Sequence, residues 1–243
     1  GATNLITGIA TAYMDSIPMV AITGNVGRSL LGKSSFQEVD IVSIAAPITK
    51  KSSIVMDIAD LADTIRDAFY IANKGRKGPV LIDIPKDITA LSYDYEPKTP
   101  VRRAPHFDLN ETQFNRAIKL ISESKRPLLY AGGGVVSAGA EKEFEAFAER
   151  LDAPVSASLM CQGAYDQKKT RYLGMLGMHG TKVSALAMKE CDLFIAVGSR
   201  FSDRVTCNTD LFARHCPVIH IDIDAKEFNK NVKADAALRG NAS

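Results

Sequence analysis

The sequence predicts an α/β protein with parallel sheets that are covered by helices on both faces. Short, continuous apolar runs recur along the chain, and this pattern is typical of strands that are buried on both faces of a sheet. Amphipathic stretches with helical spacing lie between many of these runs, which indicates an alternation of strand and helix. The chain has 243 residues, of which 46% are hydrophobic, so one or two domains with substantial cores are expected.

The composition argues against several classes of function. The net charge is +2 and the basic residues are scattered, so neither a nucleic-acid face nor a polybasic membrane patch is expected. No apolar run approaches the length of a membrane span. The cysteines, at positions 161, 191, 207 and 216, have no metal-like spacing, so we expect reduced thiols and predict no metal ligands. The expected location is the cytoplasm, or an organellar stroma or matrix in a eukaryote.

The first part of the chain alternates helix and strand. Residues 4–15 carry apolar side chains at helical spacing and predict a helix. An apolar run predicts a buried strand over residues 17–23, and a loop rich in glycine and serine follows it. Asp57 is the predicted cap of a helix that extends to about residue 73. Residues 79–85 are the next predicted strand.

Residues 91–109 differ in character from the segments around them. Prolines, mixed charges and little periodicity are typical of a linker between domains. We therefore expect a first domain over residues 1–90 and a second domain over residues 110–243.

The second domain repeats the alternation. Its predicted strands and helices are separated by glycine-rich or polar loops, of which the longest covers residues 160–172. The predicted strands are residues 127–131, 155–159, 192–198 and 217–224, and the predicted helices are residues 138–151 and 181–190.

Three glycine-bearing stretches in the second domain predict a ligand site. They are residues 132–134, 173–180 and 198–204, and each is read as a loop after a strand. Ligands of parallel sheets bind at the carboxyl ends of the strands, so these stretches should converge on one edge. Glycine lets a flat ligand approach the backbone, and methionine offers a polarizable surface for an aromatic ring. An apolar loop tucked under the domain is the alternative for residues 173–180.

The individual motifs leave alternatives open. The triplet Gly132, Gly133 and Gly134 can direct backbone N–H groups at a phosphate, or it can be a tight turn, and it does not fit the dinucleotide fingerprint. Asp222 and Asp224 end a predicted strand, where an acid can bind ribose hydroxyls or cap the next helix.

The charged candidate residues also have more than one possible role. Arg200 and Arg204 offer the planar fork that binds phosphate or carboxylate, or a surface salt bridge. Arg76 lies in a turn of the kind that is usually solvated. His179 has no metal-ligand neighbours, so it is read as a hydrogen-bonding or stacking residue.

The sequence resembles the large, catalytic subunit of the acetohydroxyacid synthase (acetolactate synthase) family, and the resemblance covers essentially the whole chain. Residues 173–180, Leu-Gly-Met-Leu-Gly-Met-His-Gly, and the Arg-Phe-x-Asp-Arg run at 200–204 are its most specific marks. Residues 1–4, 36–38, 78–87 and 220–224 also carry it, and the first and third of these are shared with related thiamine enzymes.

The resemblance implies a fold and a reaction. Residues 1–90 are similar to the later part of a pyrimidine-binding domain for thiamine diphosphate. Residues 110–243 are similar to a nearly complete Rossmann-like central domain that binds FAD, of the deoxyhypusine-synthase-like type. The family decarboxylates pyruvate on thiamine diphosphate, with Mg²⁺ holding the diphosphate, and joins the two-carbon unit to pyruvate or 2-ketobutyrate. This reaction serves valine, leucine and isoleucine biosynthesis, and FAD performs no net redox step in it.

The resemblance also assigns sites residue by residue. Asn4 and Gln37 match positions near thiamine diphosphate, and Phe36, Lys86 and Arg204 match the substrate channel, where the arginine would hold the second keto acid's carboxylate. The FAD contacts fall on Arg76, Gly132, Gly133, Gly134, Ser158, Leu159, Leu176, Gly177, Met178, His179, Gly198, Ser199, Arg200, Asp222, Ile223, Gly240 and Asn241.

The chain departs from the family pattern in places. Ser202 replaces a common Asp, Ala225 a usual Pro and Asn241 a usual Asp, while residues 33–35 replace a Thr-Asp-Ala-like run, which puts the fine shape of the channel in doubt.

The family's catalytic glutamate and its magnesium motif match nothing between Gly1 and Ser243. From these ends we expect a fragment of a longer polypeptide that is inactive alone, holds no catalytic residue of its own and binds at most FAD.

Family members form homodimers or homotetramers and often bind a small regulatory subunit. The alternatives are a related thiamine enzyme that acts on sulfoacetaldehyde or glyoxylate, and a nucleotide-binding module without catalysis.

Overall fold

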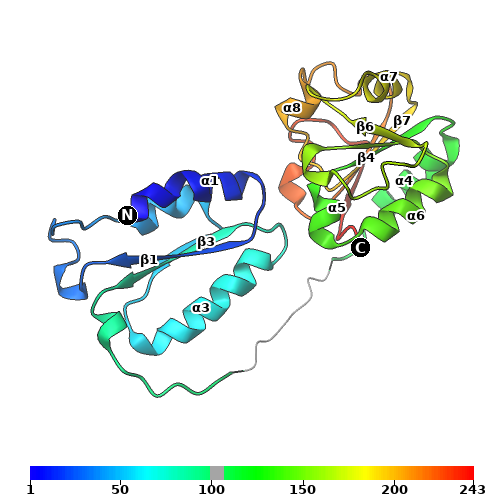
Figure 1. The fold of residues 1–243 in the computed structure, drawn as a ribbon. Coiled ribbons are helices and arrows are strands. Elements are labelled where there is room, and N and C mark those ends of the chain that lie inside the picture. Colours follow the sequence, from blue (N-terminus) through cyan, green and yellow to red (C-terminus); the bar gives the residue numbers. More distant parts are fainter. Residues whose placement is uncertain (99–106) are drawn as a thin grey trace. The chain divides into compact units, whose positions relative to one another are not determined.

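The computed structural model describes residues 1–98 and 107–243, which divide into two compact units, Gly1–Pro105 and His106–Ser243 (Figure 1). We call them unit 1 and unit 2 and describe each by itself. The predicted linker, residues 91–109, falls partly outside the described residues. Its described parts contain neither helix nor strand.

Unit 1 is a parallel three-stranded sheet between helices. Its strands have the order β1-β3-β2, with Met19 opposite Pro79 and Lys51 opposite Val80. Its elements along the chain are α1 (Ile6–Met14), β1 (Met19–Asn25), α2 (Ile41–Ala45), β2 (Lys51–Ile54), α3 (Ile58–Asn73) and β3 (Pro79–Pro85).

Alternate residues of the central strand β3 face two separate cores. Val80 and Ile82 pack with Ala68 and Ala72 of α3, whereas Leu81 on the opposite face packs with Ile9 of α1. Figure 1 accordingly shows α1 and α3 on opposite sides of the sheet. All seven residues of β3 are buried, which explains why this strand reads as one apolar run.

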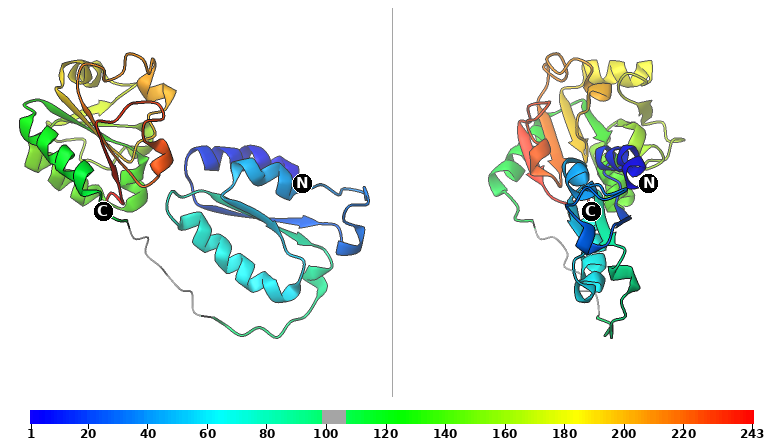
Figure 2. Two further views of the ribbon diagram at one scale, coloured as in Figure 1. Left: turned by 180° about the vertical axis from the view of Figure 1, so that it is seen from behind. Right: turned by 90° about the vertical axis from the view of Figure 1, so that its left-hand side faces the viewer.

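Unit 2 is a parallel six-stranded sheet with the order β6-β5-β4-β7-β8-β9. Figures 1 and 2 show helices on both of its faces. Its elements are α4 (Glu111–Glu123), β4 (Pro127–Ala131), α5 (Gly133–Ala138), α6 (Glu141–Leu151), β5 (Val155–Ala157), β6 (Tyr172–Met175), α7 (Lys182–Glu190), β7 (Leu193–Val197), α8 (Asp203–Thr206), β8 (Val218–Asp222) and β9 (Ala236–Arg239).

The two faces of this sheet are also built from alternate residues. Leu129 of β4 and Ile195 of β7 belong to a core that contains Phe144 of α6. Tyr130 and Phe194, which are the sequence neighbours of Leu129 and Ile195, belong to the opposite core with Met188 of α7. Both faces are therefore covered, and the prediction of parallel sheets between helices is confirmed.

The structure corrects the prediction between β4 and β5. The sequence predicts one helix over residues 138–151, but the chain forms two, α5 and α6. Gly139 separates them because it adopts a left-handed conformation (φ 68°) that ends α5. The following strand ends at Ala157, two residues earlier than predicted.

Six further elements, α2, α4, α8, β2, β6 and β9, have no counterpart in the prediction. The helices α2 and α4 begin after Asp40 and Asn110, whose side chains accept hydrogen bonds from Ser43 N and Gln113 N. The strands β2 and β9 have only four residues each; β2 has one apolar residue, Ile54, and β9 reads Ala-Ala-Leu-Arg, without a β-branched or aromatic residue. The start of the predicted loop 173–180 is also part of a strand, β6.

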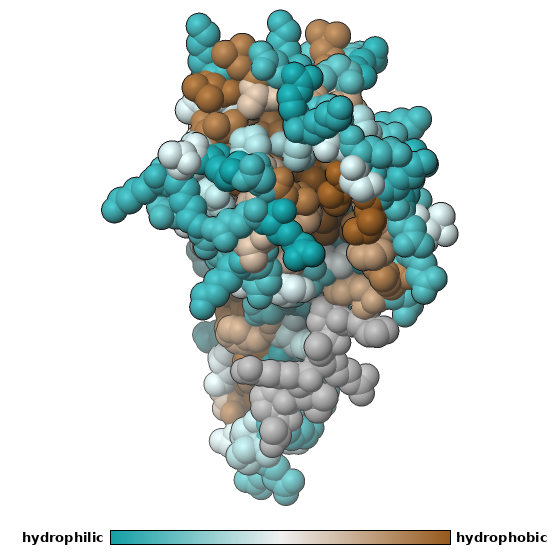
Figure 3. Space-filling view, turned by 90° about the vertical axis from the view of Figure 1, so that its right-hand side faces the viewer, coloured by the Kyte–Doolittle hydropathy of each residue, from teal (hydrophilic) through white to brown (hydrophobic). Residues whose placement is uncertain are grey.

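Figure 3 shows one face of the molecule, on which hydrophilic residues predominate and apolar residues form several smaller patches. Among the described residues, no helix has both the length and the hydropathy needed to cross a bilayer.

Candidate functional site at the carboxyl edges of the sheets

The sheet of unit 2 brings nearly all of its predicted ligand residues to one edge. Each of the six parallel strands is followed directly by at least one of them, and carboxyl ends of parallel strands share an edge. They are Gly132 after β4, Ser158 after β5, Leu176 after β6, Gly198 after β7, Ile223 after β8 and Gly240 after β9.

The centre of this edge is the point at which the strand order reverses. From β4 the chain moves outward to β5 and β6 and then crosses back to β7, on the other side of β4. Loops that follow two such strands diverge, and sheets of this type bind ligands there. The turns at Gly132 and Gly198 occupy this switch point.

These two turns are in backbone contact. A Cβ added to Gly132 would lie 2.5 Å from the carbonyl carbon of Gly198, and one added to Gly134 would lie 2.5 Å from its Cα. The N–H groups of Gly132 and Gly134 donate to the carbonyl oxygens of Val197 (2.8 Å) and Gly198 (3.0 Å). Both N–H groups therefore serve the packing of the turns, so the expectation that they face a phosphate is wrong for these two residues.

The loop after β6 reaches the loop after β7. Met178 N–H donates to the carbonyl oxygen of Arg204 (2.8 Å), and Arg204 Nη1 lies 3.4 Å from Met178 Sδ. A Cβ on Gly177 would lie 2.8 Å from Val205 Cα, so only glycine fits there. Because β5 and β4 lie between β6 and β7, residues 176–180 span the carboxyl ends of those two strands.

Apolar side chains are exposed along the same edge. Leu159, Met160 and Met178 are 72%, 44% and 53% exposed. A Cβ on Gly133 would meet Met160 Cβ at 3.0 Å, so the central glycine of the triplet lies directly against this side chain. Exposed apolar groups beside glycine turns provide a surface for a flat aromatic ligand.

A buried polar layer lies beneath the edge. The hydroxyls of Tyr130 and Ser158 are buried and make no hydrogen bond in the described part of the chain. Burial raises the pKa of Tyr130, and the nearby hydroxyls of Ser199 and Ser158 partly oppose this shift. His220 Nε2 donates to the Ser199 carbonyl oxygen (2.8 Å), and the ring packs between Phe201 and Phe228. These polar atoms support the backbone of the Gly198 turn.

The two acids at the end of β8 have different roles in the fold. Asp224 accepts a hydrogen bond from Lys226 N (3.0 Å) and caps the turn that follows, which confirms the capping alternative for this residue. Asp222 Oδ1 accepts from Asp224 N (2.8 Å), and the Asp222 carbonyl accepts from Gly240 N (3.1 Å). Asp222 therefore connects the loops after β8 and β9.

In unit 1 four of the predicted residues, Asn4, Phe36, Gln37 and Lys86, also lie at the carboxyl edge. Phe36 and Gln37 are in the loop after β1, where Phe36 is 89% exposed and Gln37 has a positive φ of 62°. Lys86 follows β3, and its N–H donates to the Asn25 carbonyl at the end of β1 (3.0 Å). Asn4 precedes α1, whose start lies on the side at which β1 ends (Figure 1).

Side chains at this edge of unit 1 are held by two carboxylates. Asp83, which is fully buried, accepts hydrogen bonds from Thr23 Oγ1 (2.7 Å) and Asn25 Nδ2 (2.6 Å). Arg28 Nε donates to Asp87 Oδ2 (2.6 Å), and this contact holds the pKa of Asp87 below its usual value.

The loop that carries Phe36 and Gln37 has its own anchor. The Glu38 carboxylate accepts from Ser35 N (2.9 Å) and from Gly32 N, and these hydrogen bonds lower the pKa of Glu38. The loop is therefore fixed at its base while Phe36 projects into solvent.

Arg76 belongs to unit 1, where its Nε donates to Ser16 Oγ (2.9 Å). It lies in the turn before β3, at the amino edge of that sheet. Its predicted contact with FAD stays a prediction.

Sequence reasoning did not select Tyr130, Met160 or Asn231. Tyr130 interrupts an apolar strand with a polar tip, a signal that was available. Asn231 Nδ2 donates to the Phe201 carbonyl (3.0 Å) from 30 residues away, and no local pattern marks such a contact.

The fold is that of an α/β protein whose parallel strands end at a candidate ligand edge, and comparisons give the family. The thiamine pyrophosphate enzyme central domain matches residues 114–243, and the N-terminal TPP-binding domain of the same enzymes matches residues 1–44. The chain belongs to the thiamine pyrophosphate enzyme family.

Its relatives include acetolactate synthase large subunits. That of Parasynechococcus marenigrum is 50% identical over 99% of this chain and 40% of the relative. The acetolactate synthase of Arthrospira platensis is 49% identical over 99% of this chain and 43% of the relative. The large subunit of Haemophilus influenzae is 44% identical over 100% of this chain and 43% of its own length. The chain thus spans about two fifths of the length of these relatives.

The buried histidine beneath the edge predicts a pH dependence of stability. Burial lowers the pKa of His220, although its hydrogen bond to Ser199 acts in the opposite direction. The unfolded chain then binds a proton near pH 6.5 that the folded chain does not, so stability falls as the pH drops below about 6.5. We expect a loss of at most about 1.4 kcal/mol per pH unit from this residue.

Urea unfolding at several pH values between neutral and mildly acidic checks this expectation. His220→Gln retains a donor for Ser199 and should remove this part of the slope. His179→Gln, a change at an exposed histidine, should leave the slope in place. Equal slopes in wild type and His220→Gln would contradict the expectation.

Proposed function

We propose that this chain forms part of an acetolactate synthase large subunit, with unit 1 beside thiamine diphosphate and unit 2 as the FAD-binding domain. The observation that carries the proposal is the identity of 43–50% to acetolactate synthases along nearly the whole chain. The reaction would condense pyruvate with pyruvate or 2-ketobutyrate, in branched-chain amino-acid biosynthesis. Assembly as a homodimer or homotetramer, with or without a small regulatory subunit, is part of the same proposal.

The residues of unit 2 fit an extended flavin nucleotide. Leu159 and Met178 present exposed apolar surface beside the glycine turns, Ser158 offers a buried hydroxyl that lacks a partner among the described residues, and Asp222, at the end of β8, would bind ribose hydroxyls. Gly133, Leu176, Gly177, His179, Ser199, Ile223 and Asn241 complete the proposed contacts along the same edge. Arg200 would bind the diphosphate through its planar fork.

Unit 1 would hold the reacting cofactor. Thiamine diphosphate supplies an electron sink for the decarboxylation of a 2-keto acid. Asn4 and Gln37 would lie beside it, while the exposed Phe36 would exclude water from the substrate channel. Lys86 would add a positive charge to the channel. No described residue is proposed as a ligand of Mg²⁺.

Arg204 would bind the carboxylate of the second keto acid. Its side chain is exposed, and its carbonyl holds Met178 N–H, so it projects from a rigid turn beside the proposed flavin surface. A fixed guanidinium reduces the entropy lost when a carboxylate binds.

A segment exchange tests the proposed activity. This chain would replace the matching two fifths of the Haemophilus influenzae large subunit, and acetolactate formation from pyruvate would be measured with thiamine diphosphate, Mg²⁺ and FAD. We expect acetolactate from the hybrid and little from its Arg204→Gln variant, which should still release carbon dioxide. A folded hybrid that instead converts sulfoacetaldehyde or glyoxylate would overturn the proposal in favour of a related thiamine enzyme.

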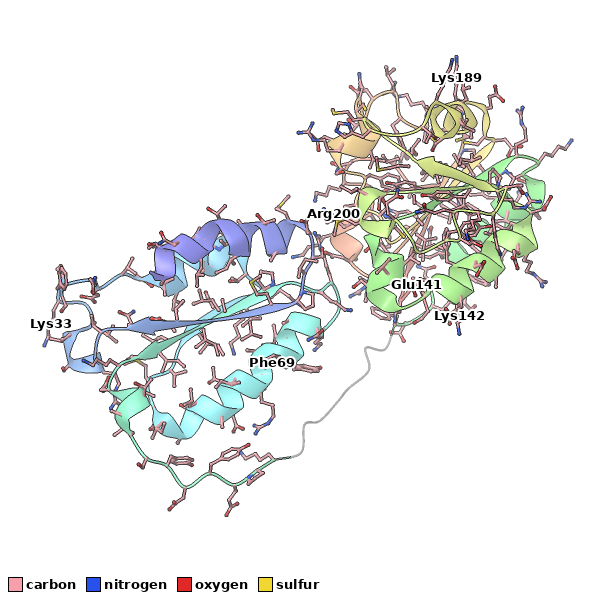
Figure 4. All side chains as sticks on the ribbon, in the orientation of Figure 1. Lys33, Phe69, Glu141, Lys142, Lys189 and Arg200 are labelled. Atoms are coloured by element: carbon pink, nitrogen blue, oxygen red, sulfur yellow. The ribbon has the colours of Figure 1, made fainter. Side chains whose placement is uncertain are left out.

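Flavin binding by the chain itself is a separate expectation. We expect FAD fluorescence to be quenched on titration with the purified chain, and Arg200→Ala to weaken binding by at least about tenfold, as expected when a charge-assisted hydrogen bond is lost. Lys189→Ala is the control because Lys189, at the end of α7, lies elsewhere on unit 2 (Figure 4). Equal affinities for the two variants would exclude Arg200 from the site.

A further inference from the structure

Two cysteines and a histidine meet at the edge of unit 2 that lies opposite the proposed flavin site. Cys191 lies two residues before β7, and Cys216 lies two residues before β8. The strands β7 and β8 are parallel neighbours, with Phe194 opposite Val218, so the segments that precede them meet at the amino edge of the sheet. His215 precedes Cys216 in the second segment.

The three side chains have the separations of a metal site. Cys191 Sγ is 3.7 Å from Cys216 Sγ and 4.0 Å from His215 Nε2, and all three atoms lie within 4.8 Å of one another. Tetrahedral zinc with ordinary Zn–S and Zn–N bonds separates two sulfurs by about 3.8 Å and a sulfur from a nitrogen by about 3.6 Å. The sulfur pair already has this spacing, and the imidazole of His215, which is exposed, has to move closer to both sulfurs, by about 1 Å at most.

We propose that Cys191, His215 and Cys216 bind one zinc ion, with water at the fourth position. Two thiolates and an imidazole form a donor set that favours zinc over Mg²⁺ or Ca²⁺. The two cysteines are only 5% and 8% exposed, whereas His215 is exposed, so an ion would have protein sulfur on its inner side and solvent on its outer side. No other group in the described chain joins this set.

The groups next to the three ligands do not supply a fourth one. The neighbouring carboxylate, Asp192, already accepts hydrogen bonds from Ser124 Oγ (2.5 Å), Lys125 N (2.9 Å) and Arg126 N (2.9 Å). Without metal, the Cys191 thiol donates to the Met188 carbonyl (3.2 Å) at the end of α7. Zinc binding would release both thiol protons to solvent and replace these weak thiol contacts by metal–sulfur bonds.

The ion would stabilise the fold, and the water at its fourth position would leave it exchangeable, unlike zinc in a site closed by four protein ligands. It would connect the end of α7 to the segment before β8, far along the strands from the switch point at their carboxyl ends. The proposal does not depend on flavin or on acetolactate formation. His215 and Cys216 follow Cys191 by 24 and 25 residues, and this spacing matches no metal motif, because only the fold brings the three ligands together.

Metal content tests the proposal. The purified chain, treated with chelator and reductant, would be given zinc chloride, dialysed and analysed for bound zinc. We expect one zinc per wild-type chain, and at least a tenfold loss of affinity in Cys191→Ser and in His215→Ala. Cys207→Ser, at an exposed cysteine outside the cluster, should bind zinc as the wild type does.

A spectroscopic measurement identifies the ligands. Cobalt(II) added to the metal-free chain should give thiolate-to-cobalt charge-transfer absorption, which disappears in Cys191→Ser. Because His215 is exposed, His215→Ala is expected to fold normally, and zinc should raise the unfolding midpoint of the wild type but not of this variant. Unchanged zinc binding in both variants, absence of zinc at micromolar concentrations, or a Cys191–Cys216 disulfide in the isolated chain would each overturn the proposal.

Discussion

Gly132→Ala should strongly destabilise unit 2. The new methyl group would lie 2.5 Å from the Gly198 carbonyl carbon and 2.7 Å from Ser199 Cα, and these are backbone atoms that no rotamer change can move. Relief requires β4 and β7 to separate, which would break the hydrogen bond from Gly132 N to the Val197 carbonyl. We expect a loss of at least about 3 kcal/mol, the upper part of the range for overpacked sites.

Hydrogen exchange followed by mass spectrometry measures this loss in the peptides that contain β4 and β7, independently of unit 1. Gly240→Ala is the matched control, because this glycine has a negative φ and no atom within 4 Å of an added Cβ. It should exchange like the wild type. Wild-type protection of β4 and β7 in Gly132→Ala would show that the two turns are not held together as described.

Asp83→Leu should have the largest effect in unit 1. Asp83 is fully buried in the central strand, and its two carboxylate oxygens accept hydrogen bonds from Thr23 and Asn25 of β1. Leucine has a similar size but removes both acceptors, so Thr23 Oγ1 keeps only the long contact to the Ile82 carbonyl (3.5 Å) and Asn25 Nδ2 only that to the Val39 carbonyl (3.2 Å). A hydrogen bond to a charged group contributes about 1.5–3 kcal/mol, and we expect a loss of about 3 kcal/mol for the pair.

The measurement is again exchange, in peptides from β1 and β3. Asp83→Asn keeps the shape and one acceptor, and we expect it to lose about half as much, which separates hydrogen bonding from packing. A stabilised Asp83→Leu variant would show that the fold does not need the carboxylate. The role of Asp83 would then be to orient Asn25 at the carboxyl edge.

The elements that could be predicted are those that the local sequence determines. The strand at 79–85 is buried along its whole length, and the helix after Asp57 has both an apolar stripe and a cap, since Asp57 accepts from Ala59 N. The short strands β2 and β9 could not be predicted in this way, because their pairing with β3 and β8 rather than their composition makes them strands.

The candidate site shows the same division. Glycine spacing and the expected parallel sheet placed residues 132–134 and 198–204 at one edge, and the structure confirms this placement. The role of Gly132 and Gly134 differs from the predicted one, because their N–H groups donate to the carbonyl oxygens of Val197 and Gly198 and not to a ligand. The cluster around Cys191 escaped prediction for a related reason: it depends on which strands are neighbours, and spacing along a chain does not contain that information.

The link between Met178 and Arg204 has a consequence for the rim of the sheet in unit 2. The strand β6 is at the border and pairs with β5 alone, so such a strand would ordinarily fray or recruit a foreign strand. Here the loop after β6 passes the carboxyl ends of β5 and β4, and Met178 N–H donates to the Arg204 carbonyl in the segment that follows β7. Detaching β6 from β5 would also break the contact with the segment after β7, at the centre of the sheet. We therefore expect this edge strand to unfold together with the central strands.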